Sequence, residues 1–351
     1  MALAAADRDS RRIASEEDGS LVAATIAAAA EQPAVQARQV AIGSLKLRLH
    51  FLTHALAAMF AGAFAAAPED GAGGESWELT VADGSCGMPP PALVPPDRDG
   101  DMLLHADAES YILWMGRHAQ ALYAVDRRRR RALYWVEDAA RVPAWERSRP
   151  FLPILQAMLD GTPWIAVHGA AIAWQGRAVL LAGPGRAGKT SLALAGLAAG
   201  WRFAGDDFVL VRTDASPEVA ALYATARLRD DMLGRFGALE PARREISFDD
   251  GERRHELAFN TLPGPLAIGG APLAAVLLLD RRGAAKPVFA PVTRTALLNA
   301  LAATTAVATP GHEPARMGKL LNLLAAPLVP RRFDPGRDFA AALAALAEAV
   351  A

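Results

Sequence analysis

One short stretch of the chain combines glycines, a lysine and a hydroxyl residue at a spacing that binds phosphate. It reads Gly183-Pro184-Gly185-Arg186-Ala187-Gly188-Lys189-Thr190, followed by Ser191. In this pattern backbone N–H groups turn toward phosphate oxygens, and the next helix adds the positive potential of its N-terminus. Lys189 then reaches the outer phosphates and the Thr190 hydroxyl is a ligand for Mg²⁺. We expect the stretch to bind a nucleotide, ATP or GTP, unless it is only a glycine-rich turn.

Two adjacent aspartates are the main candidates for the acidic groups that phosphoryl transfer needs, namely a Mg²⁺ ligand and a carboxylate near the acceptor hydroxyl. Asp206 and Asp207 follow an expected helix over 191–197 and a short strand over 201–204. That crossover returns the chain to the sheet edge that carries the phosphates. Neighbouring side chains on a strand point to opposite faces, so one Asp would meet Mg²⁺ or substrate and the other would support the loop. The spacing does not show which of the two aspartates has which role.

A histidine precedes the loop on what looks like a β-hairpin. Strands are expected over 164–174 and 177–182, and only two residues, a turn signal, separate them. The register of such a hairpin would place His168 opposite Gly183, beside the phosphates. A single His in an apolar strand is commonly a core residue, but this position favours a functional role. The hairpin also gives the strand that enters the loop an antiparallel neighbour, which predicts a mixed sheet.

Other charged residues are weaker candidates. Asp280 ends an apolar strand, as Mg²⁺ ligands do in many ATPases, but the two arginines after it favour an ion-paired turn. Arg227 and Arg229 alternate on an expected strand and either contact phosphate and acceptor or lie on solvated surface. The arginine run 127–131 is either a clamp for acidic peptide or phosphate, or a solvated turn.

The order of these features resembles the catalytic domain of the HPr kinase/phosphorylase family, especially the HPr-kinase-like proteins that accompany ribosomal-peptide and lasso-peptide clusters. The likeness is specific over about residues 160–211. It implies a P-loop kinase domain with a mixed sheet like that of phosphoenolpyruvate carboxykinase. It also implies Mg²⁺ bound by Thr190 and Asp206, and one Asp acting as base toward a serine hydroxyl. The active-site residues carried over by the resemblance are His168, Lys189, Thr190, Asp206 and Asp207.

The loop departs from the family pattern at Gly185 and Arg186, where Ser and Gly are usual, and Arg186 either adds a phosphate contact or covers the loop. Our leading hypothesis is a Mg-ATP-dependent kinase that phosphorylates a Ser or Thr hydroxyl of a peptide or protein. HPr itself is not the expected acceptor, because residues 1–145 do not resemble the N-terminal domain of the true HPr kinases. A small-molecule P-loop kinase and a non-catalytic, ATP-dependent switch that binds a partner are the alternatives.

The rest of the chain predicts the domain organisation. Residues 1–38 show no sustained hydrophobic period and are expected to form a flexible arm, or at most a short helix. Residues 39–147 predict a small α+β domain, assigned to acceptor binding, with a helix over 52–66. Its strands are expected near 45–49, 77–81, 111–115, 121–125 and 132–136. Residues 148–351 predict the catalytic domain, so that the fold class is α/β with α+β character.

Composition limits the class of protein. The 351 residues are 52% hydrophobic and 21% charged with a net charge of −1, which is typical of a globular protein and gives no field for nucleic acid or an anionic membrane. The single cysteine, Cys86, excludes an internal disulfide and fits a reducing compartment. Acidic residues interrupt the N-terminus before any apolar core, so no signal peptide is expected. We therefore predict a cytoplasmic protein; a homo-oligomer is left open.

Overall fold

The computed structural model describes residues 12–13, 18–64, 74–93, 102–116, 120–237, 239, 243–247, 253–259, 270–306, 308–328 and 330–350. These residues form a mixed α/β structure in two compact units, which divide between Thr162 and Pro163. Ala63–Ala65 belong to the second unit and Ala308–Glu313 to the first. The division lies after residue 162 rather than at the predicted 148, because the helices α4 (Ala144–Ser148) and α5 (Leu152–Leu159) pack within the first unit.

The first unit is built on a mixed sheet of eight strands in the described ranges, ordered β1-β5-β6-β7-β8-β4-β3-β2. The pairs β1–β5, β3–β4 and β4–β8 are parallel and the others antiparallel. The predicted alternation is confirmed, since Leu45, Leu47 and Leu49 are buried and the residues between them are not. The strands are β1 Arg12–Ile13, β2 Gln36–Ile42, β3 Leu45–Phe51, β4 Ser76–Asp83, β5 Leu103–Ala106, β6 Ser110–Met115, β7 Ala121–Asp126 and β8 Arg131–Val136.

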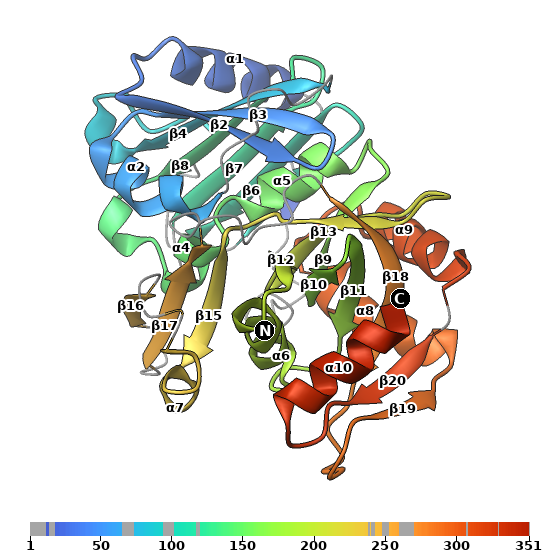
Figure 1. The fold of residues 1–351 in the computed structure, drawn as a ribbon. Coiled ribbons are helices and arrows are strands. Elements are labelled where there is room, and N and C mark those ends of the chain that lie inside the picture. Colours follow the sequence, from blue (N-terminus) through green and yellow to red (C-terminus); the bar gives the residue numbers. More distant parts are fainter. Residues whose placement is uncertain are drawn as a thin grey trace. The chain divides into compact units, whose positions relative to one another are not determined.

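Helices cover both faces of this sheet (Figure 1). On one face, α1 (Asp18–Ala30) buries Val22, Ile26 and Ala29 against a core that includes Trp114 and Trp135. On the other face lie α5 and α2 (His54–Phe60), the second of which fulfils the helix predicted after β3. The prediction of a flexible arm over 1–38 is therefore wrong for the residues of α1 and β2, because the helix supplies one side of the core.

The second unit contains a mixed nine-stranded sheet in the described residues, ordered β12-β10-β11-β18-β14-β13-β9, with β20 beside β18 and β19 beside β20. The pairs β11–β18 and β18–β20 are parallel, whereas β10–β11 is the predicted antiparallel hairpin. The mixed character of the sheet is therefore confirmed. The strands are β9 Trp164–His168, β10 Ala170–Trp174, β11 Arg177–Ala182, β12 Arg202–Gly205, β13 Phe208–Arg212, β14 Glu218–Ala220, β18 Ala271–Leu279, β19 Val288–Pro291 and β20 Arg331–Asp334.

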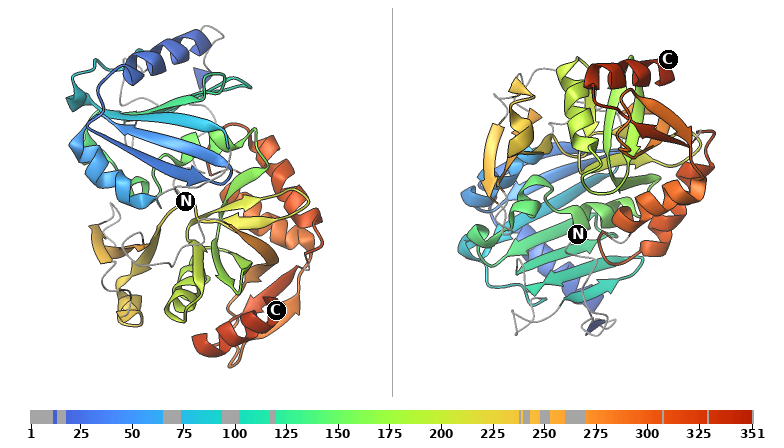
Figure 2. Two further views of the ribbon diagram at one scale, coloured as in Figure 1. Left: turned by 45° about the horizontal axis from the view of Figure 1, so that its top comes forward. Right: turned by 90° about the horizontal axis from the view of Figure 1, so that it is seen from below.

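Two layers of helices enclose this sheet, and alternate residues of its strands enter different cores. On one face Val179 and Leu181 pack with α6 (Lys189–Ala198) and α10 (Phe339–Val350). On the other face Leu180 and Ala182 pack with α8 (Arg294–Thr305) and α9 (Glu313–Ala325). The right-hand view of Figure 2 shows α6 and α10 side by side. Because β11 is buried on both faces, the loop that follows it starts from a fixed strand.

A three-stranded antiparallel sheet, β15-β17-β16, completes the second unit. Ala226 and Leu228 of β15 and Leu257 of β17 enter the same core as α6. The strands are β15 Thr225–Arg229, β16 Arg243–Ser247 and β17 Arg253–Ala258, and the short helix α7 spans Asp230–Leu233. In neither unit is any described helix both long enough and apolar enough to cross a membrane.

Candidate functional site

The glycine-rich stretch forms a tight loop between β11 and α6, as its pattern predicts. Gly183 and Gly188 have φ values of +143° and +96°, which glycine adopts without steric cost. A Cβ on Gly183 would lie 2.8 Å from the Leu279 carbonyl oxygen of β18, so only glycine fits there. The loop of β11, Gly183–Gly188 and α6 therefore has the strand–loop–helix context that phosphate binding requires.

Lys189 begins α6 and folds back onto the loop. Its side-chain ammonium donates to the carbonyl oxygens of Gly183 at 2.8 Å and Pro184 at 3.0 Å. The residue is only 8% exposed. Burial lowers the pKa of Lys189, and the nearby Asp206 acts in the opposite direction. Among the described residues no carboxylate forms an ion pair with this ammonium, which leaves its charge available to an anion.

Asp206 is joined to the loop helix by a side-chain hydrogen bond. The Thr190 hydroxyl donates to Oδ1 of Asp206 at 2.8 Å, and the Arg227 backbone N–H donates to Oδ2 at 3.4 Å. Asp206 is 5% exposed, and burial raises the pKa of its carboxyl, with the Thr190 hydrogen bond and Arg227 opposing this. The two residues predicted to hold Mg²⁺, Thr190 and Asp206, therefore lie together.

Asp207 faces different partners from Asp206. Its backbone has a left-handed φ of +66°, a conformation that Asp tolerates better than most residues. Oδ1 lies 3.3 Å from Nε2 of His168, and the Arg227 guanidinium contacts Oδ2. The two carboxylates are separated by this backbone turn between β12 and β13, and not by the alternation of a strand on which the prediction was based. Asp206 faces Thr190, and Asp207 faces His168 and Arg227.

The predicted position of His168 is wrong in its register. The hairpin pairs Ala170 with Leu181 through Trp174 with Arg177, as predicted, but the run 164–174 is two strands that part at Gly169. His168 ends β9 and lies opposite Phe208 of β13 instead of Gly183. It reaches the site through Asp207. When an apolar segment changes the strand with which it pairs, the hydrophobic pattern of the sequence does not change, so the sequence could not show the break at Gly169.

The strands β9 and β10 pair with β13 and β12 as one antiparallel ribbon. Phe208 is opposite His168 and Gly205 is opposite Ala171, so the register is continuous across the acidic pair itself, and it shifts between Ala171 and Ile172. Between them the Gly169 N–H donates to the Asp207 carbonyl at 3.2 Å. Asp206 and Asp207 therefore lie in the middle of the ribbon. On one side of them is the β10–β12 pair, at one end of the strand order, and on the other side is the β9–β13 pair, at the opposite end.

Of the two candidate arginines, the structure brings only Arg227 into contact with the acidic pair. Arg229 lies two residues further along β15, is exposed, and is opposite Arg254 in the register. Asp280 bonds to Arg282, with Nε and Oδ2 2.8 Å apart, and lies 3.9 Å from Arg332. The interpretation of Asp280 as part of an ion-paired turn is therefore confirmed.

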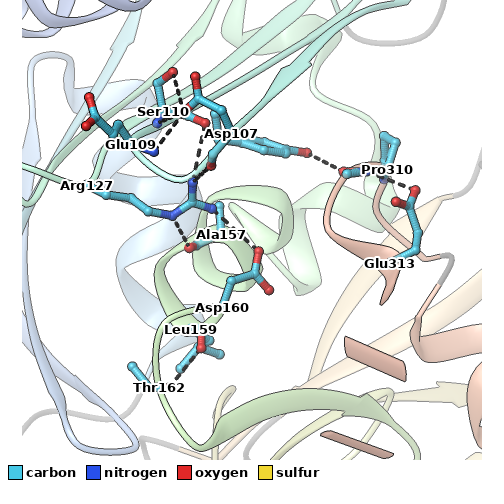
Figure 3. A network of polar contacts seen from close by, with 12 residues as sticks. Asp107, Glu109, Ser110, Arg127, Ala157, Leu159, Asp160, Thr162, Pro310 and Glu313 are labelled. Carbon is cyan, nitrogen blue, oxygen red and sulfur yellow. Dashed lines mark hydrogen bonds and ion pairs between the residues drawn. The ribbon is translucent and has the colours of Figure 1, made fainter. Parts of the chain in front are cut away.

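The arginine run 127–131 has structural partners. Figure 3 shows Arg127 among the carbonyl oxygens of Asp107, Ser110 and Ala157, with Asp160 3.5 Å away. The four following arginines pair in turn with Glu109, Asp126, Glu75 and Glu78. The run therefore anchors a turn to its own unit, and these contacts favour the interpretation as a solvated turn.

Two residues that the sequence analysis did not single out adjoin the site. The Thr305 hydroxyl of α8 accepts the backbone N–H of His168 at 3.0 Å and fixes the end of β9. Arg281 lies against the loop, since its Cδ is 3.4 Å from where a Cβ on Gly188 would stand. Both come from distant parts of the chain. The sequence feature that could have pointed to Arg281 is its position directly after an apolar strand. No sequence feature marks Thr305.

The residues present fit a Mg-nucleotide. The loop offers backbone N–H groups, a buried lysine and a hydroxyl beside a carboxylate, and Mg²⁺ bound with phosphates needs only one or two protein ligands. Within the described ranges no group of three or more His, Cys, Asp or Glu is arranged to hold a metal by itself. The Thr190–Asp206 pair therefore suits an ion that arrives with a phosphate ligand.

Comparison with known proteins adds no assignment: no protein-family model matches the chain, and no curated protein matches it.

Proposed function

We propose that the second unit is a Mg-ATP-dependent kinase that transfers the terminal phosphate to a Ser or Thr hydroxyl of a peptide or protein. The observation that carries the proposal is the hydrogen bond from Thr190 of the loop helix to Asp206, with Asp207 beside it. Nucleotide binding alone needs the loop, whereas phosphoryl transfer also needs carboxylates at the metal and at the acceptor. The mixed sheet supports the fold implied by the HPr kinase resemblance.

Three residues of the chain would hold Mg-ATP. Thr190 and Asp206 would bind the metal, and Lys189 would exchange its two loop carbonyls for the outer phosphates. When bound, Mg²⁺ would neutralise charge on the phosphate oxygens. The backbone N–H groups of the loop and the start of α6 would add positive potential at the same place. ATP is preferred to GTP in this proposal only through the family resemblance.

Asp207 is the proposed base, because Asp206 and its partner Thr190 are the proposed metal ligands. The acceptor hydroxyl would lose its proton to Asp207 while its oxygen forms a bond to the terminal phosphorus. The bond from that phosphorus to the bridging oxygen breaks, and ADP leaves with the electron pair. His168 and Arg227 contact Asp207 and act as positioning residues, since they hold the carboxylate in one orientation.

The acceptor class comes from the resemblance, in which the base acts on a serine hydroxyl. We assign acceptor binding to the first unit and Arg227 to the acceptor side of the acidic pair. The proposal also keeps a cytoplasmic location, in accord with the single cysteine.

The test uses the full chain with Mg²⁺ and γ-labelled ATP, offered both a Ser/Thr peptide library and a panel of small hydroxyl compounds. We expect label in peptides. Asp207→Asn should keep ATP affinity within about threefold and lose transfer by at least about a hundredfold, as expected for loss of general-base catalysis. Lys189→Met should weaken ATP binding by about 10- to 100-fold, because charge-assisted hydrogen bonds are lost. Asp280→Asn, a carboxylate in the ion-paired turn, is the matched control and should behave like the wild type.

Each contrary outcome has a distinct meaning. Label in small compounds alone would identify a small-molecule kinase. ATP binding with no transfer to either set, together with unchanged cellular function of Asp207→Asn, would identify a nucleotide-dependent switch. Transfer that survives in Asp207→Asn would remove Asp207 from the role of base.

A further inference from the structure

Arg281 is brought to the phosphate loop by the strand next to the one that enters it. Strand β18 runs parallel to β11, and the register places Leu278 opposite Ala182, the last residue of β11. Parallel neighbours end at the same edge of a sheet, so the residues after β18 adjoin the loop. The close approach of the Leu279 carbonyl to Gly183 shows the same proximity.

The side chain of Arg281 lies against the last glycine of the loop. A Cβ built on Gly188 would be 3.4 Å from Cδ of Arg281 and 3.6 Å from Nη1 of its guanidinium. The glycine, with φ of +96°, leaves the backbone open to this approach. Gly188 directly precedes Lys189, so the guanidinium adjoins the part of the loop that serves the outer phosphates.

The turn that carries Arg281 is fixed by a carboxylate. Asp334 of β20 accepts the backbone N–H groups of Arg282 at 2.7 Å, Ala284 at 3.2 Å and Gly336 at 2.9 Å. Although burial acts in the opposite direction, these N–H donors, with a smaller contribution from the charge of Arg281, lower the pKa of Asp334. The carboxylate is therefore ionised at neutral pH and holds the turn, so the root of the Arg281 side chain is set before any ligand binds.

Arg281 is not committed to an ion pair within the described part of the chain. The carboxylate of its neighbour Asp280 is taken by Arg282 and lies near Arg332. No carboxylate of the described residues stands within 4.0 Å of the Arg281 guanidinium. A positive side chain that is exposed, fixed at its root and pressed against a phosphate loop is suited to bind an anion there.

We propose that Arg281 contacts the terminal phosphate of the bound nucleotide and makes the loop prefer a nucleoside triphosphate to a diphosphate. This inference rests on the proposed function. The backbone N–H groups and Lys189 serve the phosphates that both nucleotides share. A guanidinium presents a planar fork of donors that matches a phosphate bidentately, and here it stands at the outer end of the loop.

The test measures the affinities of Mg-ATP and Mg-ADP for the full chain by titration calorimetry. In Arg281→Ala we expect the affinity for Mg-ATP to fall at least about tenfold, as for loss of a charge-assisted hydrogen bond, and that for Mg-ADP to change less than about twofold. Arg281→Lys keeps the charge without the fork and should lie between. Arg177→Ala, an exposed arginine at the end of β11 that is remote from the loop, is the matched control and should leave both affinities unchanged.

The outcomes separate this inference from the proposed function. If Arg281→Ala binds both nucleotides as the wild type does, the inference fails and the kinase proposal stands. If both affinities fall by the same factor, Arg281 supports the loop and does not select the terminal phosphate. If the wild-type chain binds neither nucleotide, both proposals are overturned.

Discussion

Glu146 in α4 provides the sharpest stability prediction, because its carboxyl is fully buried and its hydrogen-bond donors are a backbone N–H and a tyrosine hydroxyl. The residue is 0% exposed, Oε1 accepts the Phe151 backbone N–H at 2.9 Å and Oε2 accepts the Tyr123 hydroxyl at 3.0 Å. Burial raises the pKa of Glu146 from 4.5 to about 7, and the two hydrogen bonds and Arg149 only partly oppose this. The first unit is therefore more stable when Glu146 is neutral.

The perturbation is Glu146→Gln, which keeps the shape and stays neutral at every pH. A pKa raised in the folded state adds stability that is fully present below pH 4.5 and is lost as pH rises to about 7. Across that interval, at about 1.4 kcal/mol per pH unit, the wild type loses roughly 3 kcal/mol relative to the variant. The variant should match the wild type at low pH and exceed it at high pH.

Hydrogen exchange of the β7 and β8 amides in the full chain measures this difference, because these core strands exchange through opening of the first unit. After correction for intrinsic exchange, the opening free energy of Glu146→Gln should exceed that of the wild type by about 2–3 kcal/mol more at pH 8 than at pH 5. Glu78→Gln, a partly exposed carboxylate on β4 of the same sheet, is the control and should show no such change. Equal pH dependence in the wild type and Glu146→Gln would refute the reasoning.

Two further predictions concern the loop. Asp206 has a raised pKa, so its carboxylate takes up a proton at a higher pH than an ordinary Asp; Mg-ATP affinity, measured by titration calorimetry, should therefore fall as pH is lowered toward 5, and this fall should be smaller in Asp206→Asn. An unchanged pH profile in the variant would exclude Asp206 as the titrating group. Gly183→Ala should destabilise the second unit by at least about 1–3 kcal/mol in a denaturant titration, from its left-handed φ and the Leu279 carbonyl 2.8 Å away. In Gly185→Ala nothing lies within 4 Å of the new Cβ, so comparable losses in both variants would contradict the steric argument.

Local patterns predicted the parts of the fold that depend on neighbouring residues. The alternation of Leu45, Leu47 and Leu49 gave the correct strand, and the two-residue turn gave the register of β10 with β11. The glycine spacing placed the loop between strand and helix, because Gly183 and Gly188 adopt backbone φ values that other residues disfavour. The prediction that Asp206 and Asp207 have different partners assumed the alternation of a strand, whereas a turn between β12 and β13 separates them.

Long-range pairing was outside the reach of these patterns. The run 164–174 reads as one apolar strand, yet it changes partner at Gly169, so His168 was placed opposite Gly183. For α1 the sequence allowed at most a short helix and did not predict that Val22, Ile26 and Ala29 pack in a core, because the alanines around them hide the apolar face. The contacts of Arg281 with the loop depend on β18 pairing with β11, which neither segment shows alone.

The ribbon that carries the acidic pair also sets the order in which the site forms during folding. Pairing of β10 with β11 closes a loop of only two residues. Pairing of β9 with β13, which places Trp164 opposite Arg212, closes a much longer loop that contains β10, β11, α6 and β12. Closing the longer loop costs more entropy and contributes to slower folding. We expect the strand that enters the phosphate loop to pair before Asp206 and Asp207 have their places. Mg-nucleotide binding would then stabilise only the fully paired unit.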